Sequence, residues 1–489
     1  MLKNISVEKK NFLIFLLVHF LVWGLLGGIR LVLPTDTLEG IWWGSLESFG
    51  NPKHPPLAGW ISYFVYNMFG KIDIFMYLLS QSFIIGGFIF VYKLAKFFVD
   101  ENKAMLSVIV LEGCWIYSYI TGYYGFNPDV VLLLTLPAVV YYFYRSMNIN
   151  KAYDWIMLGI WVGISCLGKY QTLFVLIPMA IWAIIFNRKT FSNKYFYLAV
   201  MIAFVMFSPH LMWLFKHEFM PLMYYDSKLT TIDFVSHLVA PFSFLFMQMA
   251  MIAGAVLIFV INKIIDKSSF KINKKLDKNG WFLVILTVTP LVIHMIMGLC
   301  SGGNIRPQWG FVFWYLTGII LFYFISYDLN QNSFKNILKS SYIVMTIILL
   351  SFGTMLVVEK SYRSRYPVSQ VYGDLSKMWE QKYHSPLKYI GGLIDFTYPI
   401  TIYAPSHPIN IMDTYNADNI WIDKQDLKKH GALIIVKHKG EIEEAVRLSC
   451  PYLDKNIKIK ASLYRPDLVN ALGLSRKYKM YYYMVEPQK

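Results

Sequence analysis

A succession of long apolar segments constrains the fold of this chain more than any other feature. The first segment runs from Asn11 to Leu33, and about 20 helical residues suffice to cross the roughly 30 Å hydrocarbon core of a bilayer. Hydrophobic residues make up 56% of the 489 residues, above the usual share in a soluble domain. The sequence therefore predicts a polytopic α-helical membrane protein with about eleven transmembrane helices, near residues 11–33, 73–97, 104–122, 129–146, 153–168, 170–186, 195–215, 239–262, 281–299, 309–327 and 340–358.

The positive charges indicate how these helices are oriented. The net charge is +16, but the lysines and arginines fall mostly in short loops between apolar segments and not on one continuous face. This distribution argues against nucleic acid as a partner. It follows the rule that cytoplasmic loops are enriched in Lys and Arg. With a cytoplasmic N-terminus, most of these cations lie in cytoplasmic loops, and the opposite loops hold Lys53, Lys71, Lys169, Lys216, Lys228 and Arg306.

An odd number of helices places the polar C-terminal segment outside the cytoplasm. Residues 359–489 contain the apolar runs Ala432–Val436 and Met480–Val485 and turn signals such as His430-Gly431, which indicate a small α/β domain. We therefore expect a transmembrane domain over residues 1–358, which carries the chemistry, and a periplasmic α/β domain over residues 359–489. The protein is expected in the bacterial inner membrane.

The loop after the first apolar segment contains candidate catalytic acids. Asp36 and Glu39 precede Trp42-Trp43, a pattern typical of an amphipathic helix at the membrane interface. A carboxylate at this boundary can take a proton from an incoming hydroxyl group. A further acid, Asp129, follows Pro128 at the start of a predicted helix, where the helix dipole alone also favours it.

Three basic residues on the same side are candidate ligands for a phosphate group. His54 lies in the run His54-Pro55-Pro56-Leu57. Lys169 interrupts an apolar stretch with almost no loop around it, and a lysine at such depth usually has an anionic partner. Arg306 offers a planar guanidinium group that suits phosphate.

Carboxylates and cations together in the outer loops of a transmembrane domain suggest one kind of reaction. The cations can hold a lipid phosphate, whose negative charge grows as it leaves. An acid nearby can deprotonate an acceptor hydroxyl group. The pattern favours glycosyl transfer from a polyprenyl-phosphate sugar outside the cytoplasm.

Several motifs resemble those of a known family, the bacterial glycosyltransferases of the GT-C fold. The most similar members are the protein-mannosyltransferase-like and aminoarabinose-transferase-like enzymes, which use dolichyl- or undecaprenyl-phosphate sugars. The resemblance rests on Asp36, the Lys53-His54-Pro55-Pro56-Leu57 run with Trp60, Asn127-Pro128-Asp129, Gly168-Lys169-Tyr170, Pro209-His210 with Trp213, and Asn419-Ile420-Trp421-Ile422-Asp423.

The resemblance implies roles for four positions. The family's catalytic base after the first helix matches Asp36, and the cation that contacts lipid phosphate matches His54. The acid that opens the fourth helix matches Asp129, and the lysine between the fifth and sixth helices matches Lys169.

Two departures from the family pattern bear on specificity. Many members have an Asp-Glu pair where this chain has Asp36-Thr37, and its next acid is Glu39, whose role is left open. The aminoarabinose transferases also carry an arginine shortly after the acid, which this chain lacks. The absence of that arginine weakens any assignment of the same sugar or acceptor.

The expected partners are a polyprenyl-phosphate sugar donor, membrane lipids, and an acceptor that is lipid A, another glycolipid or a protein. No cofactor is required by the pattern, although a divalent cation shared by Asp36 and Asp129 stays open. Two alternatives also stay open. One is a lipid-linked sugar flippase or polysaccharide polymerase, and the other is a non-enzymatic membrane scaffold.

Overall fold

The computed structural model describes residues 6–28, 30, 32–228, 233–269, 271–272, 276–301, 305–330, 332–358, 367–411, 421–469 and 475–488. Asn419 and Ile420, which contribute to the family resemblance, lie outside the described residues. The chain divides into two compact units. The first consists of Met1–Leu26, Ser48–Ala58 and Tyr77–Phe352, and the second of Gly27–Glu47, Gly59–Met76 and Gly353–Lys489.

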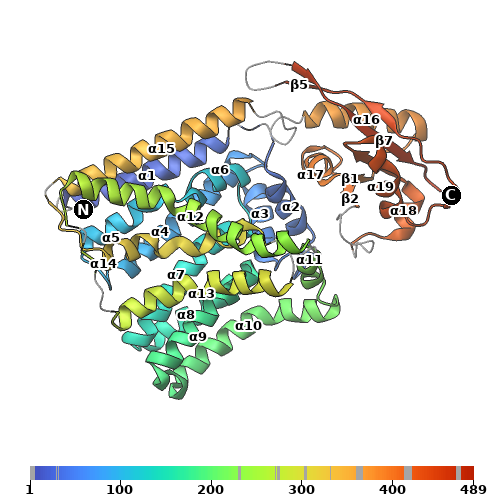
Figure 1. The fold of residues 1–489 in the computed structure, drawn as a ribbon. Helices are drawn as coiled ribbons and strands as arrows, with labels where there is room; N and C mark the ends of the chain where they lie inside the picture. The colour runs from blue at the N-terminus through green and yellow to red at the C-terminus, as the bar shows by residue number, and fades with distance from the viewer. Residues whose placement is uncertain are drawn as a thin grey trace. The chain divides into compact units, whose positions relative to one another are not determined.

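The first unit is a bundle of apolar helices (Figure 1). Helix α8 packs against both α7 and α10, and α1 lies beside α15, where the rings of Phe15 and Tyr342 are 6.1 Å apart. The principal helices are α1 (Val7–Gly27), α4 (Ile74–Ala95), α5 (Glu101–Ile109), α6 (Tyr119–Tyr124), α7 (Pro128–Asn148), α8 (Ala152–Gly168), α9 (Leu173–Phe186), α10 (Lys194–Lys216), α11 (Met220–Lys228), α12 (Phe234–Ile265), α13 (Lys278–Ser301), α14 (Thr317–Phe324) and α15 (Ser333–Val358).

The described part of the chain has seven helices that are long and apolar enough to cross a membrane. An eighth is present if Glu101–Gly113 and Trp115–Tyr124, which meet at a bend of 81°, form one broken span. The protein is therefore a multi-pass membrane protein. Three further predicted spans coincide with the shorter apolar helices Ala152–Gly168, Tyr170–Phe186 and Phe311–Phe324. The total of eleven spans stays a prediction.

Several predicted boundaries are wrong. The last span was expected to begin at residue 340, but α15 begins at Ser333. The first span was expected to reach Leu33, but α1 ends at Gly27. Gly27 and Gly28 favour a helix end, and the chain then turns before Arg30.

The second unit contains an α/β structure, as expected. Its five-stranded sheet has the order β2-β1-β3-β7-β4, with β1 parallel to β2 and β3, and β7 antiparallel to β3 and β4. The two predicted apolar runs form β3 and β7. The strands are β1 (Tyr389–Gly392), β2 (Ile409–Asn410), β3 (Ala432–Val436), β4 (Ser462–Tyr464) and β7 (Met480–Val485), with a separate pair of β5 (Asp467–Val469) and β6 (Ser475–Lys477).

Helices of the second unit come from two distant parts of the chain. Those of the C-terminal segment are α16 (Val368–Tyr383), α17 (Ile394–Tyr403), α18 (Lys424–His430) and α19 (Ile442–Ser449). The early part of the chain adds α2 (Thr35–Ser45) and most of α3 (Leu57–Met68). Helix α2 packs against α17. The domain division between residues 358 and 359 stays a prediction.

Candidate functional site

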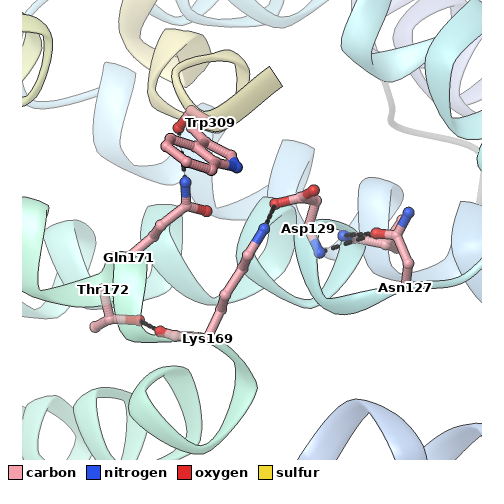
Figure 2. Close-up of polar contacts among 7 residues, drawn as sticks. Asn127, Asp129, Lys169, Gln171, Thr172 and Trp309 are labelled. Atoms are coloured by element: carbon pink, nitrogen blue, oxygen red, sulfur yellow. Dashed lines mark hydrogen bonds and ion pairs between the residues drawn. The ribbon is translucent and has the colours of Figure 1, made fainter. Parts of the chain in front are cut away.

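An ion pair joins the start of α7 to the end of α8. Asn127 caps α7, because its Oδ1 accepts hydrogen bonds from the backbone N–H groups of Asp129 (2.9 Å) and Val130 (3.2 Å). Helix α8 ends at Gly168, and the Nζ of Lys169 then lies 2.6 Å from Oδ1 of Asp129 (Figure 2). Lys169 thus has the anionic partner that its position near the membrane predicts. Both side chains are mostly shielded, with 13% and 24% exposure for Lys169 and Asp129.

A chain of hydroxyl groups fixes the backbone that carries Lys169. The Thr172 hydroxyl donates to the Lys169 carbonyl at 3.0 Å, and the Thr172 and Ser165 hydroxyls are 2.7 Å apart. Gly168 permits close packing against α7, because a Cβ there would lie 2.7 Å from a methyl group of Val131. The ammonium group of Lys169 therefore projects from a rigid turn.

The loop that carries Lys53 and His54 is held from within. Oδ1 of Asn51 accepts hydrogen bonds from the backbone N–H groups of Lys53 (3.0 Å) and His54 (2.8 Å). Gly50 lies against the ring of Trp213, where a Cβ would be 2.3 Å from a ring carbon. No larger residue fits at Gly50 without moving the loop.

His210 of α10 connects this loop to the turn after Lys169. Its Nδ1 is 2.6 Å from the carbonyl oxygen of Phe49, and its Nε2 is 2.8 Å from the hydroxyl of Tyr170. A carbonyl oxygen only accepts, so Nδ1 carries the proton, and Nε2 of the neutral ring accepts from the Tyr170 hydroxyl. The ring of His210 is fully buried. Both loops are thereby tied to one point on α10.

The electrostatic environment of His54 shows that cations gather here. Burial of the ring, followed by the nearby ammonium groups of Lys169 and Lys53, holds the pKa of His54 well below its usual range. Lys53 is itself buried, and its Nζ lies 5.4 Å from the centre of the Tyr224 ring. This part of the first unit therefore suits an anionic ligand.

Two side-chain amides hold the segment that follows Arg306. Nε2 of Gln171 donates to the carbonyl of Trp309 at 2.9 Å, and Nε2 of Gln248 donates to the carbonyl of Pro307 at 2.8 Å. Gln171 is two residues beyond Lys169, so the segment lies beside the Lys169 turn (Figure 2). The Arg306 side chain is exposed.

Asp36 and Glu39 lie in the second unit, on the helix that the sequence predicts for this loop. Asp36 is in the first turn of α2, and its side chain is exposed. Glu39 is buried, and its Oε1 accepts a hydrogen bond of 3.2 Å from the hydroxyl of Tyr398. The two acids therefore differ in environment.

Within the first unit, the structure brings Asp129, Lys169 and His54 together, with the segment of Arg306 beside Lys169. The predictions missed the supporting roles of Gln171, Gln248 and His210. His210 belongs to a motif of the family resemblance, but its partners are distant in sequence. Among the described residues, no group of three or more His, Cys, Asp or Glu side chains is arranged to hold a metal ion.

Comparison with known proteins gives a match to one family model and a match to solved structures of one fold. The model described as dolichyl-phosphate-mannose-protein mannosyltransferase matches residues 53–213, the range that contains His54, Asp129, Lys169 and His210. No curated protein sequence matches the chain.

Two solved structures match nearly the whole chain. ArnT from Cupriavidus metallidurans in the apo state has a TM-score of 0.64 at 12% identity, with 99% of this chain and 100% of that chain covered. The same protein bound to undecaprenyl phosphate has a TM-score of 0.63 at 12% identity, with 97% and 99% covered. The expected GT-C fold is thereby confirmed.

Proposed function

We propose that this protein of the GT-C fold is a glycosyltransferase that uses a polyprenyl-phosphate sugar as donor. The acceptor is a component of the cell envelope, either lipid A, another glycolipid or a protein, on the outer face of the bacterial inner membrane. The observation that carries the proposal is the cluster of Lys53 and His54, in the loop before α3, with Lys169 at the end of α8, and with one carboxylate, Asp129, paired to Lys169. An ArnT structure of the same fold contains undecaprenyl phosphate.

The cationic cluster suits the phosphate of such a donor. When the glycosidic bond breaks, negative charge builds up on the lipid phosphate that leaves. Lys169, His54 and Arg306 are proposed to contact that phosphate while the lipid chain stays in the bilayer. Asp129 holds the ammonium group of Lys169 in place at 2.6 Å, so Asp129 acts here as a positioning residue.

Asp36 is proposed as the general base that takes the proton of the acceptor hydroxyl. Its exposed side chain can meet an incoming acceptor. Glu39 is buried against Tyr398, which favours a supporting role. A glycosidic bond then forms between the acceptor oxygen and the sugar as the bond to the lipid phosphate breaks.

Substitution of Asp36 tests the base. Asp36→Asn should insert and fold normally but lower kcat about 10²-fold or more, the usual scale of acid–base catalysis, with little change in donor KM. Glu47→Gln is the matched control, because Glu47 is an exposed acid just beyond α2. Full turnover of a folded Asp36→Asn protein would contradict the assignment. If the Asp36→Asn protein instead has full activity in a cell-envelope assay, the alternative of a non-enzymatic membrane scaffold is favoured.

Substitution of Lys169 tests the phosphate site. Lys169→Ala should raise donor KM about tenfold or more, because a charge-assisted hydrogen bond contributes roughly 1.5–3 kcal/mol. Lys216→Ala is the control, since Lys216 is an exposed lysine at the end of α10. His54→Ala and Arg306→Ala should act in the same direction as Lys169→Ala. If all three alanine variants use the donor like the wild type, the phosphate binds elsewhere.

Mass spectrometry of envelope lipids and proteins from cells with and without the protein identifies the product. Loss of a hexose or amino sugar would name donor and acceptor together. Unchanged glycosylation with altered export of a lipid-linked sugar would instead support the flippase alternative.

A further inference from the structure

Helix α2, which carries the proposed base, is bonded to a helix far along the chain. The hydroxyl of Thr35 donates to Oδ1 of Asp395 at 2.6 Å, and the hydroxyl of Tyr398 donates to Oε1 of Glu39 at 3.2 Å. Asp395 and Tyr398 both lie in α17, and all four residues belong to the second unit. The two hydrogen bonds join positions that are 360 and 359 residues apart.

The bond between Tyr398 and Glu39 is buried, and the bond between Thr35 and Asp395 is partly buried. Tyr398 is 1% exposed, Glu39 is 6% exposed and Asp395 is 7% exposed. A buried carboxylate that loses its hydrogen-bond donor is destabilising, because its desolvation is no longer compensated. The two bonds therefore hold α2 and α17 in one relative position.

Helix α17 is itself anchored to the sheet. It follows strand β1, which lies between β2 and β3, and the backbone N–H of Leu393 donates to the carbonyl of Ile435 at 2.8 Å. The side-chain amide of Asn410 in β2 donates to the Thr397 hydroxyl at 2.8 Å. The sheet thus provides a rigid support for α17.

A third bond fixes the segment that leads into α2. The hydroxyl of Tyr403, the last residue of α17, accepts from the backbone N–H of Leu33 at 3.0 Å and donates to Oδ2 of Asp73 at 2.7 Å. The contacts of α17 therefore reach residues before, at and after the start of α2.

These contacts flank Asp36 on the helix. Thr35 and Glu39 are four residues apart and share one face of α2, which is the face that meets α17. Asp36 is one residue beyond Thr35, about 100° further around the helix, and its side chain is exposed. Fixing the first face fixes the direction in which Asp36 projects.

We propose that α17 is a positioning element for the proposed base, and that Asp395 and Tyr398 are its positioning residues. The inference rests on the proposed function. It means that the C-terminal segment contributes to turnover itself, by aiming the carboxylate of Asp36 at the acceptor hydroxyl, in addition to any guidance of the acceptor.

Two conservative substitutions in the full-length protein test this inference. Tyr398→Phe removes one oxygen atom and keeps the ring. Asp395→Leu removes the acceptor for Thr35, whereas Asp395→Asn keeps an acceptor oxygen. We expect Tyr398→Phe and Asp395→Leu to lower kcat about ten- to hundredfold, the scale of a misplacement near 1 Å, with donor KM unchanged. Asp395→Asn should retain most of the turnover.

Tyr464→Phe is the matched control, because the Tyr464 hydroxyl also bonds a carboxylate, that of Asp374, in the same unit, and neither residue belongs to α2 or α17. It should leave kcat unchanged. The melting temperature of each variant shows whether a loss of turnover follows from unfolding.

The outcomes separate the inference from the proposed function. If Asp36→Asn is inactive while folded Tyr398→Phe and Asp395→Leu proteins keep wild-type kcat, the positioning role is wrong and the base assignment stands. If a folded Asp36→Asn protein keeps full turnover, the base assignment fails and the positioning role fails with it, whereas the glycosyltransferase function stands. A rise in donor KM at constant kcat would also overturn the inference, because it would place α17 in donor binding.

Discussion

His54 is a proposed phosphate contact, and its charge depends on pH. Burial and two neighbouring lysines lower its pKa in the free protein, so the ring is neutral near pH 7. The negative phosphate of a bound donor favours the protonated ring and raises its pKa. Between these two pKa values, donor binding takes up a proton, so the affinity for the donor increases as the pH falls.

We therefore predict that donor KM decreases as the pH is lowered from about 7 toward the depressed pKa of the free His54 ring. His54→Lys should abolish this dependence, because lysine is charged throughout the range. Steady-state kinetics at several pH values checks the prediction. An identical pH dependence of KM in wild type and His54→Lys would show that another group titrates.

Individual residues differ in how much the sequence reveals about them. Lys169 is predictable, because a lysine in an apolar stretch demands an anion. Its pairing with Asp129 requires the antiparallel packing of α7 and α8, which no local pattern specifies. Gln171 and His210 were missed as supports for the same reason: their partners Trp309 and Phe49 are 138 and 161 residues away.

At the level of elements, the bend between Glu101–Gly113 and Trp115–Tyr124 contains a buried polar cluster. Nδ1 of His19 in α1 lies 2.5 Å from Oε2 of Glu112, and Nε1 of Trp23 donates to Oε1 at 2.9 Å. His19, Trp23 and Glu112 are fully buried. The cluster ties α1 to the break in the helix.

Removing one partner of the His19–Glu112 pair should lower the stability of the protein more than replacing both with neutral residues. We predict that His19→Leu destabilises the protein by about 3–5 kcal/mol, because it leaves a buried carboxylate without its partner. The double variant His19→Leu/Glu112→Gln should recover much of this loss and keep an acceptor for Trp23. Glu101→Gln, at an exposed position, is the control. Thermal unfolding in detergent measures the differences, and a double variant no more stable than His19→Leu would contradict the argument.

Hydropathy predicts where the helices lie but not how they end or bend. Each predicted span overlaps a helical segment, because apolar length alone identifies the approximate positions of the spans. The end of α1 at Gly27 and the bend near Cys114 depend on backbone and packing. Helix α2 was predicted from its amphipathic pattern, yet its partner α17 was not, since the pattern shows only that one face is apolar.

At the scale of the whole molecule, the distribution of positive charge predicts that the C-terminal segment lies in the periplasm. A reporter that is active only in the periplasm, fused after Lys489, should be active, whereas the same reporter fused after Lys189 should be silent. Activity of the second fusion alone would mean that the spans are miscounted, and the outer-face assignment of Asp129, Lys169 and Arg306 would fall with it.

The sequence suggests two domains in linear order, whereas the compact units interleave. Residues 27–47 and 59–76 belong with the C-terminal segment. The sequence changes from apolar to polar near residue 358, and a change of composition is the signal by which a sequence indicates a domain boundary. Contacts between segments more than 300 residues apart leave no such trace.

The contact of α2 with α17 also sets an order of events during biosynthesis. Thr35 leaves the ribosome 360 residues before Asp395, a delay of about 20 to 70 s at bacterial elongation rates of roughly 5–20 residues per second. Through that interval the nascent chain already has its first helices in the bilayer but lacks the support for α2. If α17 positions the proposed base, a chain cut short before α17 would be inserted but would lack the support for Asp36, and full turnover would begin only when translation is nearly finished.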